Sequence, residues 1–163
     1  MNQVRLCGGM FLAAMVIGLV STAYGAQEAA VWPTWRGPGM MGISPDGDPP
    51  VSWSESKNVK WKVRVPGDGS DSSPVIWGDK LIFQAAVETD RKPANPDKGG
   101  RGAPATIYAF QIVCLDRQTG RTLWTRTVTE AKPHQGHHRD HGFASFSPVT
   151  DGTHIWATFG SRG

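Results

Sequence analysis

Four histidines within eight residues form the densest group of chemically versatile side chains in this chain. They are His134, His137, His138 and His141, and Asp140 lies among them. Imidazole and carboxylate groups are common ligands of zinc and of other transition metals. On a helix the four imidazoles would share one face, because they stand at i, i+3, i+4 and i+7. The spacing therefore predicts a metal site on these four histidines.

The same segment departs from the zinc-protease pattern, which leaves an alternative open. No His-Glu-x-x-His motif occurs, and neither glutamate nor cysteine lies between His134 and His141. Pro133 suits the first turn of a helix, whereas Gly136 and Gly142 weaken one. The alternative is a polar, solvated loop whose histidines hydrogen-bond to the backbone or to one another.

Short β-strands are the elements that must position this loop. Residues 59–65 alternate between apolar and basic types, which predicts a strand whose buried face carries Trp61. Residues 112–124 predict a β-hairpin, in which Gly120 takes a positive φ and Asp116 caps backbone amides. The 20 glycines and 12 prolines of the 163 residues also favour strands and turns over helices.

The chain contains an internal repeat. Trp61 aligns with Trp124, and each is followed by a Ser-Pro-Val, at 73–75 and at 147–149. Each Ser-Pro-Val leads into a hairpin with a Gly/Asp turn. One complete four-stranded unit is predicted, with strands at about 73–77, 80–87, 106–115 and 121–128. Repeated four-stranded sheets arranged around an axis are the propeller architecture.

Segment 114–124 resembles the repeat of quinoprotein-type, or PQQ-like, β-propellers. The repeat has a small residue, an Asp, a Thr-Gly-basic run and a Trp at these positions, and Cys114 stands where the family usually has Ala. The Trp-x-x-Trp-Arg-Gly-Pro opening at 32–38 is similar to the start of many such propellers. The fold that this implies is all-β: a partial β-propeller of four-stranded antiparallel blades, about one complete blade plus two partial ones.

The resemblance also implies roles for the repeat residues. In such repeats the tryptophan docks between neighbouring blades, so Trp61 and Trp124 are expected to be docked, while Asp116 and Gly120 shape the turn. Burial of Trp124 predicts that Trp124→Ala costs roughly 3–5 kcal/mol. Cys114, inside an apolar strand, is predicted to be a buried small hydrophobe rather than a catalytic thiol.

The N-terminus is predicted to be an export signal, residues 1–25. Arg5 precedes an apolar run at 10–20, and Ala23-Tyr24-Gly25 offers small residues for cleavage before Ala26. The run is shorter than the roughly 20 residues of a membrane span; the alternative is an uncleaved anchor. The mature protein is expected in the periplasm or secreted, with membrane contact only through this signal.

Two further regions follow the predicted signal. Residues 26–58 are a Trp- and Pro-rich lead-in, expected to be an ordered coil, and 59–163 are the propeller blades of an incomplete ring. The strand at 59–65 matches the last strand of a blade without the blade's other three. The chain is therefore interpreted as an N-terminal fragment whose partners are other blades of a longer chain; the alternative is a self-sufficient small β domain.

The two long connections of the repeat are expected to share one face. They are residues 88–105 and the connection before Pro148, which is 11 residues longer than its counterpart before Pro74. Sites on rigid β scaffolds usually lie on such loops, so a protein or small-molecule ligand is expected there. The Gly-Gly-Arg-Gly at 99–102 is interpreted as a flexible loop, because a net charge of +3 is too low for nucleic-acid binding.

Three functions stay open. The sequence favours a non-catalytic binding or assembly module over an enzyme. The second is a fragment of a PQQ-dependent dehydrogenase, for which the family would bind PQQ and Ca²⁺ on the propeller axis; no vicinal Cys pair, Asp base or calcium ligands are assignable. The third is a metal-dependent enzyme using the loop 134–141. No cofactor follows from the sequence, since propeller repeats alone do not imply one.

Overall fold

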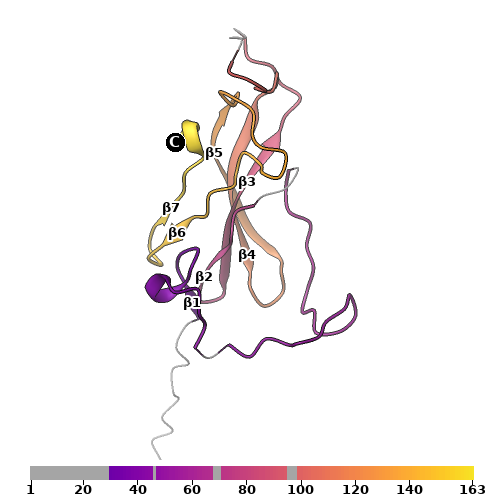
Figure 1. Cartoon of the computed structure of the whole chain (residues 1–163), viewed down its shortest axis with the longest axis vertical. Coiled ribbons are helices and arrows are strands. Elements are labelled where there is room, and N and C mark those ends of the chain that lie inside the picture. The colour runs from indigo at the N-terminus through magenta and orange to yellow at the C-terminus, as the bar shows by residue number, and fades with distance from the viewer. Residues whose placement is uncertain (1–29, 46, 68–70, 95–98) are drawn as a thin grey trace, which may run out of the picture.

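A computed structural model describes residues 30–45, 47–67, 71–94 and 99–163 (Figure 1). In this part of the chain the fold is all-β, with two short 3-10 turns, η1 (Pro38–Met40) and η2 (Gly160–Arg162). The strands are β1 (Val31–Trp32), β2 (Val75–Trp77), β3 (Lys80–Glu88), β4 (Tyr108–Asp116), β5 (Thr122–Ala131), β6 (Val149–Thr150) and β7 (Ile155–Trp156). The predicted signal, residues 1–25, lies outside the described residues. Among the residues described, no helix is long and apolar enough to cross a membrane.

The strands form two open antiparallel sheets within the described residues. The larger has the order β1-β2-β3-β4-β5, and the smaller pairs β6 with β7. From β2 to β5 each strand pairs with the next along the chain, so the predicted strand order of the repeat unit is confirmed as a meander. The observed bounds differ from the predicted ones by at most three residues.

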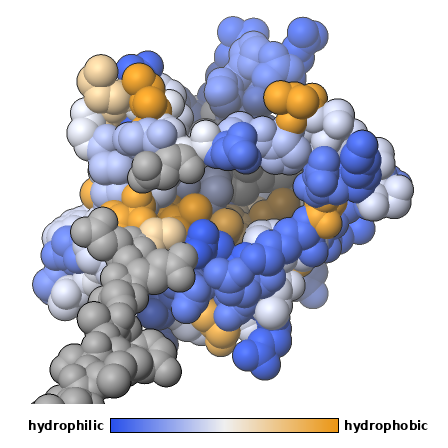
Figure 2. Space-filling model, turned by 90° about the horizontal axis from the view of Figure 1, so that it is seen from below, coloured by the Kyte–Doolittle hydropathy of each residue, from blue (hydrophilic) through white to orange (hydrophobic). Residues whose placement is uncertain are grey.

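The centre of the larger sheet is apolar on both faces because chain segments cover both. On one face Phe83, Ala85 and Val113 form a buried cluster against which Trp61 packs. On the other face the segment after β5 returns, and Ile155 of β7 packs on a buried cluster of Val75, Ile82 and Cys114. Figure 1 shows these two covering segments on either side of the sheet. In the view from below, hydrophobic residues lie in a hollow between outer polar ones (Figure 2).

One expectation about the N-terminal half holds only in part, and another is wrong. The lead-in is not coil throughout, because Val31 and Trp32 pair with β2 and extend the sheet by one strand. Segment 59–65 forms no β-ladder, although its sequence alternates. A ladder needs backbone hydrogen bonds to a paired strand, and this segment is paired with no strand among the described residues; Val59 and Val63 are exposed.

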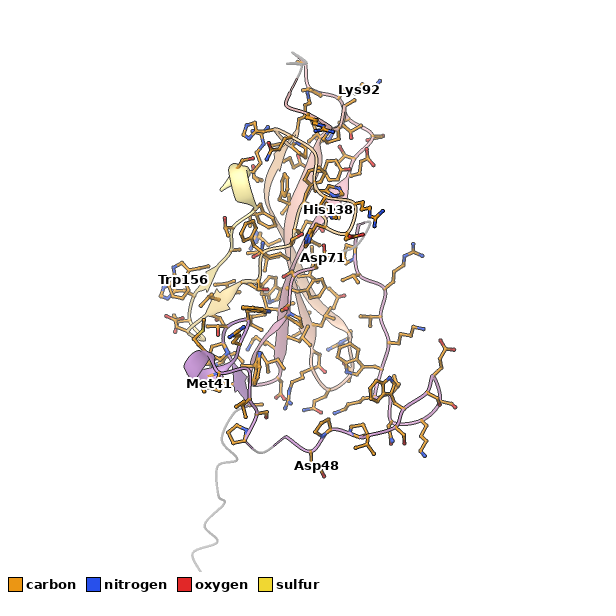
Figure 3. The ribbon with its side chains drawn as sticks, viewed as in Figure 1. Met41, Asp48, Asp71, Lys92, His138 and Trp156 are labelled. Carbon is orange, nitrogen blue, oxygen red and sulfur yellow. The ribbon has the colours of Figure 1, made fainter. Side chains whose placement is uncertain are left out.

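The two Ser-Pro-Val copies lie next to each other. The backbone N–H of Ser73 donates to Oγ of Ser147 over 3.0 Å. The turn of the second hairpin rests on the first copy, because a Cβ on Gly152 would lie 2.2 Å from the ring of Trp77. Figure 3 shows Trp156 on the outer side of this second hairpin. The sequence repeat is thus also a spatial repeat.

Candidate functional site

The two long connections meet at one end of the larger sheet, as the sequence predicted. The β3–β4 connection carries Lys92 and the β5–β6 connection carries His138, and both residues lie in the upper half of Figure 3. The short β2–β3 and β4–β5 turns lie at the opposite end of the meander. We call the first the long-loop end and the second the tight-turn end.

The long-loop end is held together by backbone contacts. The N–H of Gly100 donates to the carbonyl of His134 at 2.7 Å, and the N–H of Gly136 donates to the carbonyl of Arg101 at 3.0 Å. A Cβ on Gly136 would lie 2.6 Å from the carbonyl oxygen of Gly102. These glycines allow two loops to approach closely, so residues 99–102 hydrogen-bond to the second long connection, while their flexibility stays a prediction.

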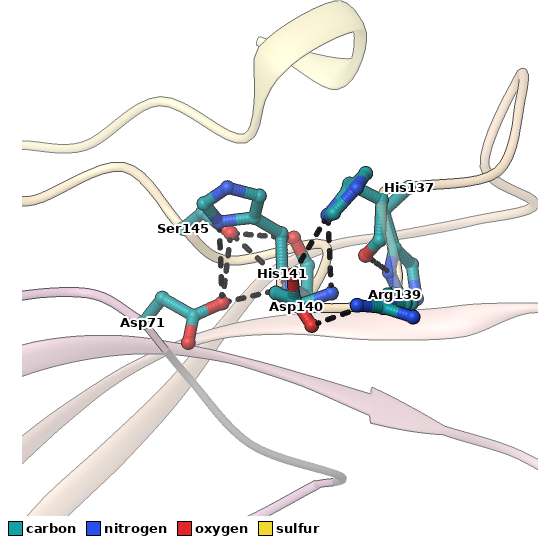
Figure 4. A network of polar contacts seen from close by, with 8 residues as sticks. Asp71, His137, Arg139, Asp140, His141 and Ser145 are labelled. Carbon is teal, nitrogen blue, oxygen red and sulfur yellow. Dashed lines mark hydrogen bonds and ion pairs between the residues drawn. The ribbon is translucent and has the colours of Figure 1, made fainter.

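The four histidines predicted as ligands do not point to a common centre. Nδ1 of His134 lies 2.8 Å from Oγ of Ser161, while Nδ1 of His137 donates to the backbone carbonyl of His138. Nδ1 of His141 lies 3.7 Å from a carboxylate oxygen of Asp71. Figure 4 shows the separate contacts of His137 and His141.

A helix over 134–141 is absent from the structure, so the predicted shared helical face does not form. Nδ1 of His138 lies 3.4 Å from Oδ2 of Asp140. In the described part of the chain no group of three or more His, Cys, Asp or Glu residues is arranged to hold a metal ion. The observed arrangement matches the polar-loop alternative, in which histidines bond to the backbone and to neighbouring side chains.

Asp71 joins the two copies of the repeat at this end. One of its carboxylate oxygens accepts hydrogen bonds from the N–H of Gly142 at 2.8 Å and from Oγ of Ser145 at 3.2 Å. Asp71 precedes β2, whereas Gly142 and Ser145 precede β6 (Figure 4). This carboxylate therefore fixes the second long connection against the first copy.

A cavity of about 140 Å³ opens beside the histidine loop. Four phenylalanines line it, and its polar side carries an imidazole, a hydroxyl and a guanidinium: Phe110, Phe143, Phe146, Phe159, His134, Ser161 and Arg162. A neighbouring cavity shares Phe143 and is lined by Arg101, Tyr108 and His137. None of these aromatic residues is among the predicted site residues. The signal was present in Phe143-Ala144-Ser145-Phe146, which lies between the histidines and the second Ser-Pro-Val.

The tight-turn end is built by the repeat residues as the sequence predicted. Oδ1 of Asp116 accepts hydrogen bonds from the N–H and the hydroxyl of Thr119, at 2.7 and 2.8 Å, and from the N–H of Gln118. The Thr119 hydroxyl, the Thr119 N–H and the Gln118 N–H lower the pKa of Asp116 below its usual value. Gly120 has a φ of 73°, the left-handed region that closes the turn.

Trp61 docks on this turn. Its Nε1 donates to the carbonyl of Arg117 at 2.9 Å. A Cβ on Gly120 would lie 2.7 Å from the Trp61 ring, so only glycine allows this approach. Trp61 is the one residue of segment 59–65 that packs against the buried cluster of the sheet within the described chain.

Trp124 occupies the same repeat position but is not docked. It lies on β5, at the edge of the larger sheet, and its side chain is 37 % exposed. The expectation that Trp124 is buried is therefore wrong for this part of the chain. The reason is that among the described residues no second glycine turn lies against it.

Cys114 matches its prediction. It is a free thiol with no exposed surface, and it belongs to the buried cluster with Val75 and Ile82. Burial raises the pKa of the thiol, which keeps it protonated and unreactive at neutral pH.

Comparison with protein-family models, with curated proteins and with solved structures found no match. The likeness to PQQ-like repeats accordingly rests on the residues of the chain itself. The contacts at the tight-turn end serve to pack Trp61 against the sheet. The long-loop end combines cavities with basic and aromatic side chains and is the candidate site.

Proposed function

We propose that this chain is an exported PQQ-like β-propeller repeat protein that acts as a non-catalytic binding or assembly module. The observation that carries the proposal is the docking of Trp61 on the turn 116–121 of the next repeat unit. A tryptophan between neighbouring units is the contact that the repeat resemblance implies. Its Nε1 bond to Arg117 and the tight approach to Gly120 fix both the orientation and the spacing of the two units.

The exposed edge of the larger sheet supports further units. β5 is ten residues long and carries the exposed apolar side chains of Leu123, Trp124 and Val128. A long edge strand with exposed apolar side chains is normally covered in the assembled protein. In the proposal, a turn of the 116–121 type from a further repeat covers Trp124 as the present turn covers Trp61.

The adjacent Ser-Pro-Val copies support an arrangement of units around an axis. β2 and β6 each follow one of these copies, and Ser73 bonds Ser147 between them. In the proposal, β6 and β7 are the first two strands of a second blade. Segment 59–65 is the last strand of a blade whose other strands come from further repeats, which explains its extended but unpaired backbone.

The binding half of the proposal rests on the long-loop end. A meander holds two connections that hydrogen-bond to each other through Gly100 and Gly136. One cavity opens between these connections, and a second opens between the β5–β6 connection and residues 159–162. Ligand sites on β scaffolds are commonly built this way, from loops positioned by a fixed sheet. The ligand is accordingly expected at this end rather than at the tight turns.

The reading frame and the native mass test the proposal together. We expect the genomic frame to continue into further Asp-x-x-Thr-Gly-x-x-x-Trp repeats, and the mature protein to begin at Ala26. A native, folded monomer no larger than these 163 residues would contradict the propeller, because a ring needs about four to eight blades.

A further inference from the structure

The aromatic cavity at the long-loop end has the size and the walls for one aromatic ring. Phe110 and Phe159 are buried, and their ring centroids lie 5.1 Å apart. Phe143 and Phe146 line the cavity with them. Its volume is about 140 Å³, and an apolar cavity of roughly 150 Å³ is enough to bind benzene.

The polar side of the cavity offers hydrogen-bond donors. Nδ1 of His134 lies 2.8 Å from Oγ of Ser161, which places both groups at one position on the wall. Arg162 lines the cavity, and its Nη2 donates one hydrogen bond to the carbonyl of Lys132. A guanidinium on a cavity wall favours an anionic ligand, because it can form charge-assisted hydrogen bonds to a carboxylate oxygen.

The charge around the cavity favours an anion. The residues lining this cavity and its neighbour include Arg162 and Arg101 but neither aspartate nor glutamate. The carboxylate of Asp71, at the same end of the sheet, already accepts bonds from Gly142 and Ser145. A carboxylate entering the cavity therefore meets basic groups and hydroxyls but no like charge in the lining.

Resting on the binding role proposed above, we propose that this cavity binds a small aromatic carboxylate. The ring lies among the four phenylalanines, and the carboxylate faces His134, Ser161 and Arg162. The ring supplies apolar contact and edge-to-face packing. The carboxylate supplies the charge-assisted hydrogen bonds that orient the ligand.

The direct test is a titration of the whole chain with benzoate, followed by amide NMR. We expect shifts at Gly136, Gly142 and Ser161, and none at Gly78 or Gly152, which lie outside the cavity lining. Benzamide keeps the ring and loses the charge, and is expected to bind about tenfold more weakly. Cyclohexanecarboxylate keeps the charge and loses the aromatic ring, and is expected to bind about threefold more weakly.

Two substitutions separate the charge from the ring. Arg162→Gln is expected to weaken benzoate about tenfold and to leave benzamide unchanged. Arg139→Gln is the matched control, because it makes the same charge change on the same end with a side chain that is 87 % exposed and outside the cavity. Phe146→Leu, at a side chain that is 54 % exposed, is expected to weaken both ring ligands and spare cyclohexanecarboxylate.

Folding of each protein is first checked by the near-ultraviolet circular dichroism of its tryptophans. In a folded protein, three results would overturn the inference. They are the absence of shifts at millimolar benzoate, equal affinities for benzoate and benzamide, and equal effects of Arg162→Gln and Arg139→Gln. Each result leaves the propeller proposal standing, because benzoate binding does not test whether further repeats follow. Conversely, a reading frame without further repeats would leave the titration unaffected.

Discussion

Trp61 and Trp124 stand at the same position of two repeat copies, yet one is docked and the other is exposed. Trp61 has a glycine turn against its ring and a carbonyl acceptor for its indole N–H. Trp124 is part of β5, the edge strand of the larger sheet, and it is 37 % exposed. The difference shows that a strand alone does not bury the repeat tryptophan. The turn of the neighbouring unit does.

Replacing each tryptophan in turn gives the largest expected difference between the copies. Trp61→Ala is expected to lower the free energy of unfolding by roughly 2–3 kcal/mol, below the roughly 3–5 of a fully buried Trp, because Trp61 is half-buried. In the 163-residue chain, without the further repeat proposed to cover Trp124, Trp124→Ala is expected to cost less than about 1 kcal/mol. Urea unfolding of both variants measures the two losses in free energy of unfolding. Equal losses would contradict the difference in docking between the two tryptophans.

Replacing the glycine tests the docking contact from the other side. Gly120→Ala is expected to cost about 2 kcal/mol for two reasons. Alanine is strained at a φ of 73°, and its methyl group would lie 2.7 Å from the Trp61 ring. Gly78→Ala is the matched control, with a φ of 60° and open space around its Cβ. It is expected to cost about 1 kcal/mol of backbone strain alone. Chemical denaturation of the two variants gives the difference; no difference would remove the steric role of Trp61.

The turn between β6 and β7, in the second repeat copy, is expected to lose stability at low pH. Asp151 accepts bonds from the N–H and the ring of His154 and from the N–H of Thr153, which lower its pKa to about 2. The usual aspartate pKa is about 3.9, so this stabilisation is complete above that pH and is lost as the pH falls toward 2. The Thr153 and His154 amide resonances are expected to shift across that window. Asp151→Asn should abolish the carboxylate titration; an unchanged profile would assign it elsewhere.

The smallest expected effect concerns the ion pair on β5. Nη2 of Arg91, in the β3–β4 connection, lies 2.6 Å from a carboxylate oxygen of Glu130, and both side chains are about half exposed. Exposed pairs of this kind contribute about 0–1 kcal/mol. Arg91→Gln is expected to lower the melting temperature only slightly, and less in 1 M salt. A large loss would mean that this pair, rather than the loop backbone, holds the long connection in place.

Much of the meander was predictable because its signals are local. The apolar runs of β3 and β4 and the Asp116 and Gly120 turn depend on residues close together in the chain. The prediction for segment 59–65 was wrong because alternation describes a suitable strand but does not supply the neighbouring backbone. The helical arrangement of the four histidines did not form for a related reason: helical spacing matters only where the backbone is helical.

The sequence by itself determined the all-β class, the order of the central strands and the turn chemistry of Asp116, since each depends on side chains within a few residues. Only the tertiary structure decided which tryptophan is docked and which residues surround the cavity. Phe110 and Phe159 are far apart in the chain, as are His134 and Ser161. Their meeting depends on the whole path between them, because packing and backbone hydrogen bonds fix that path cooperatively.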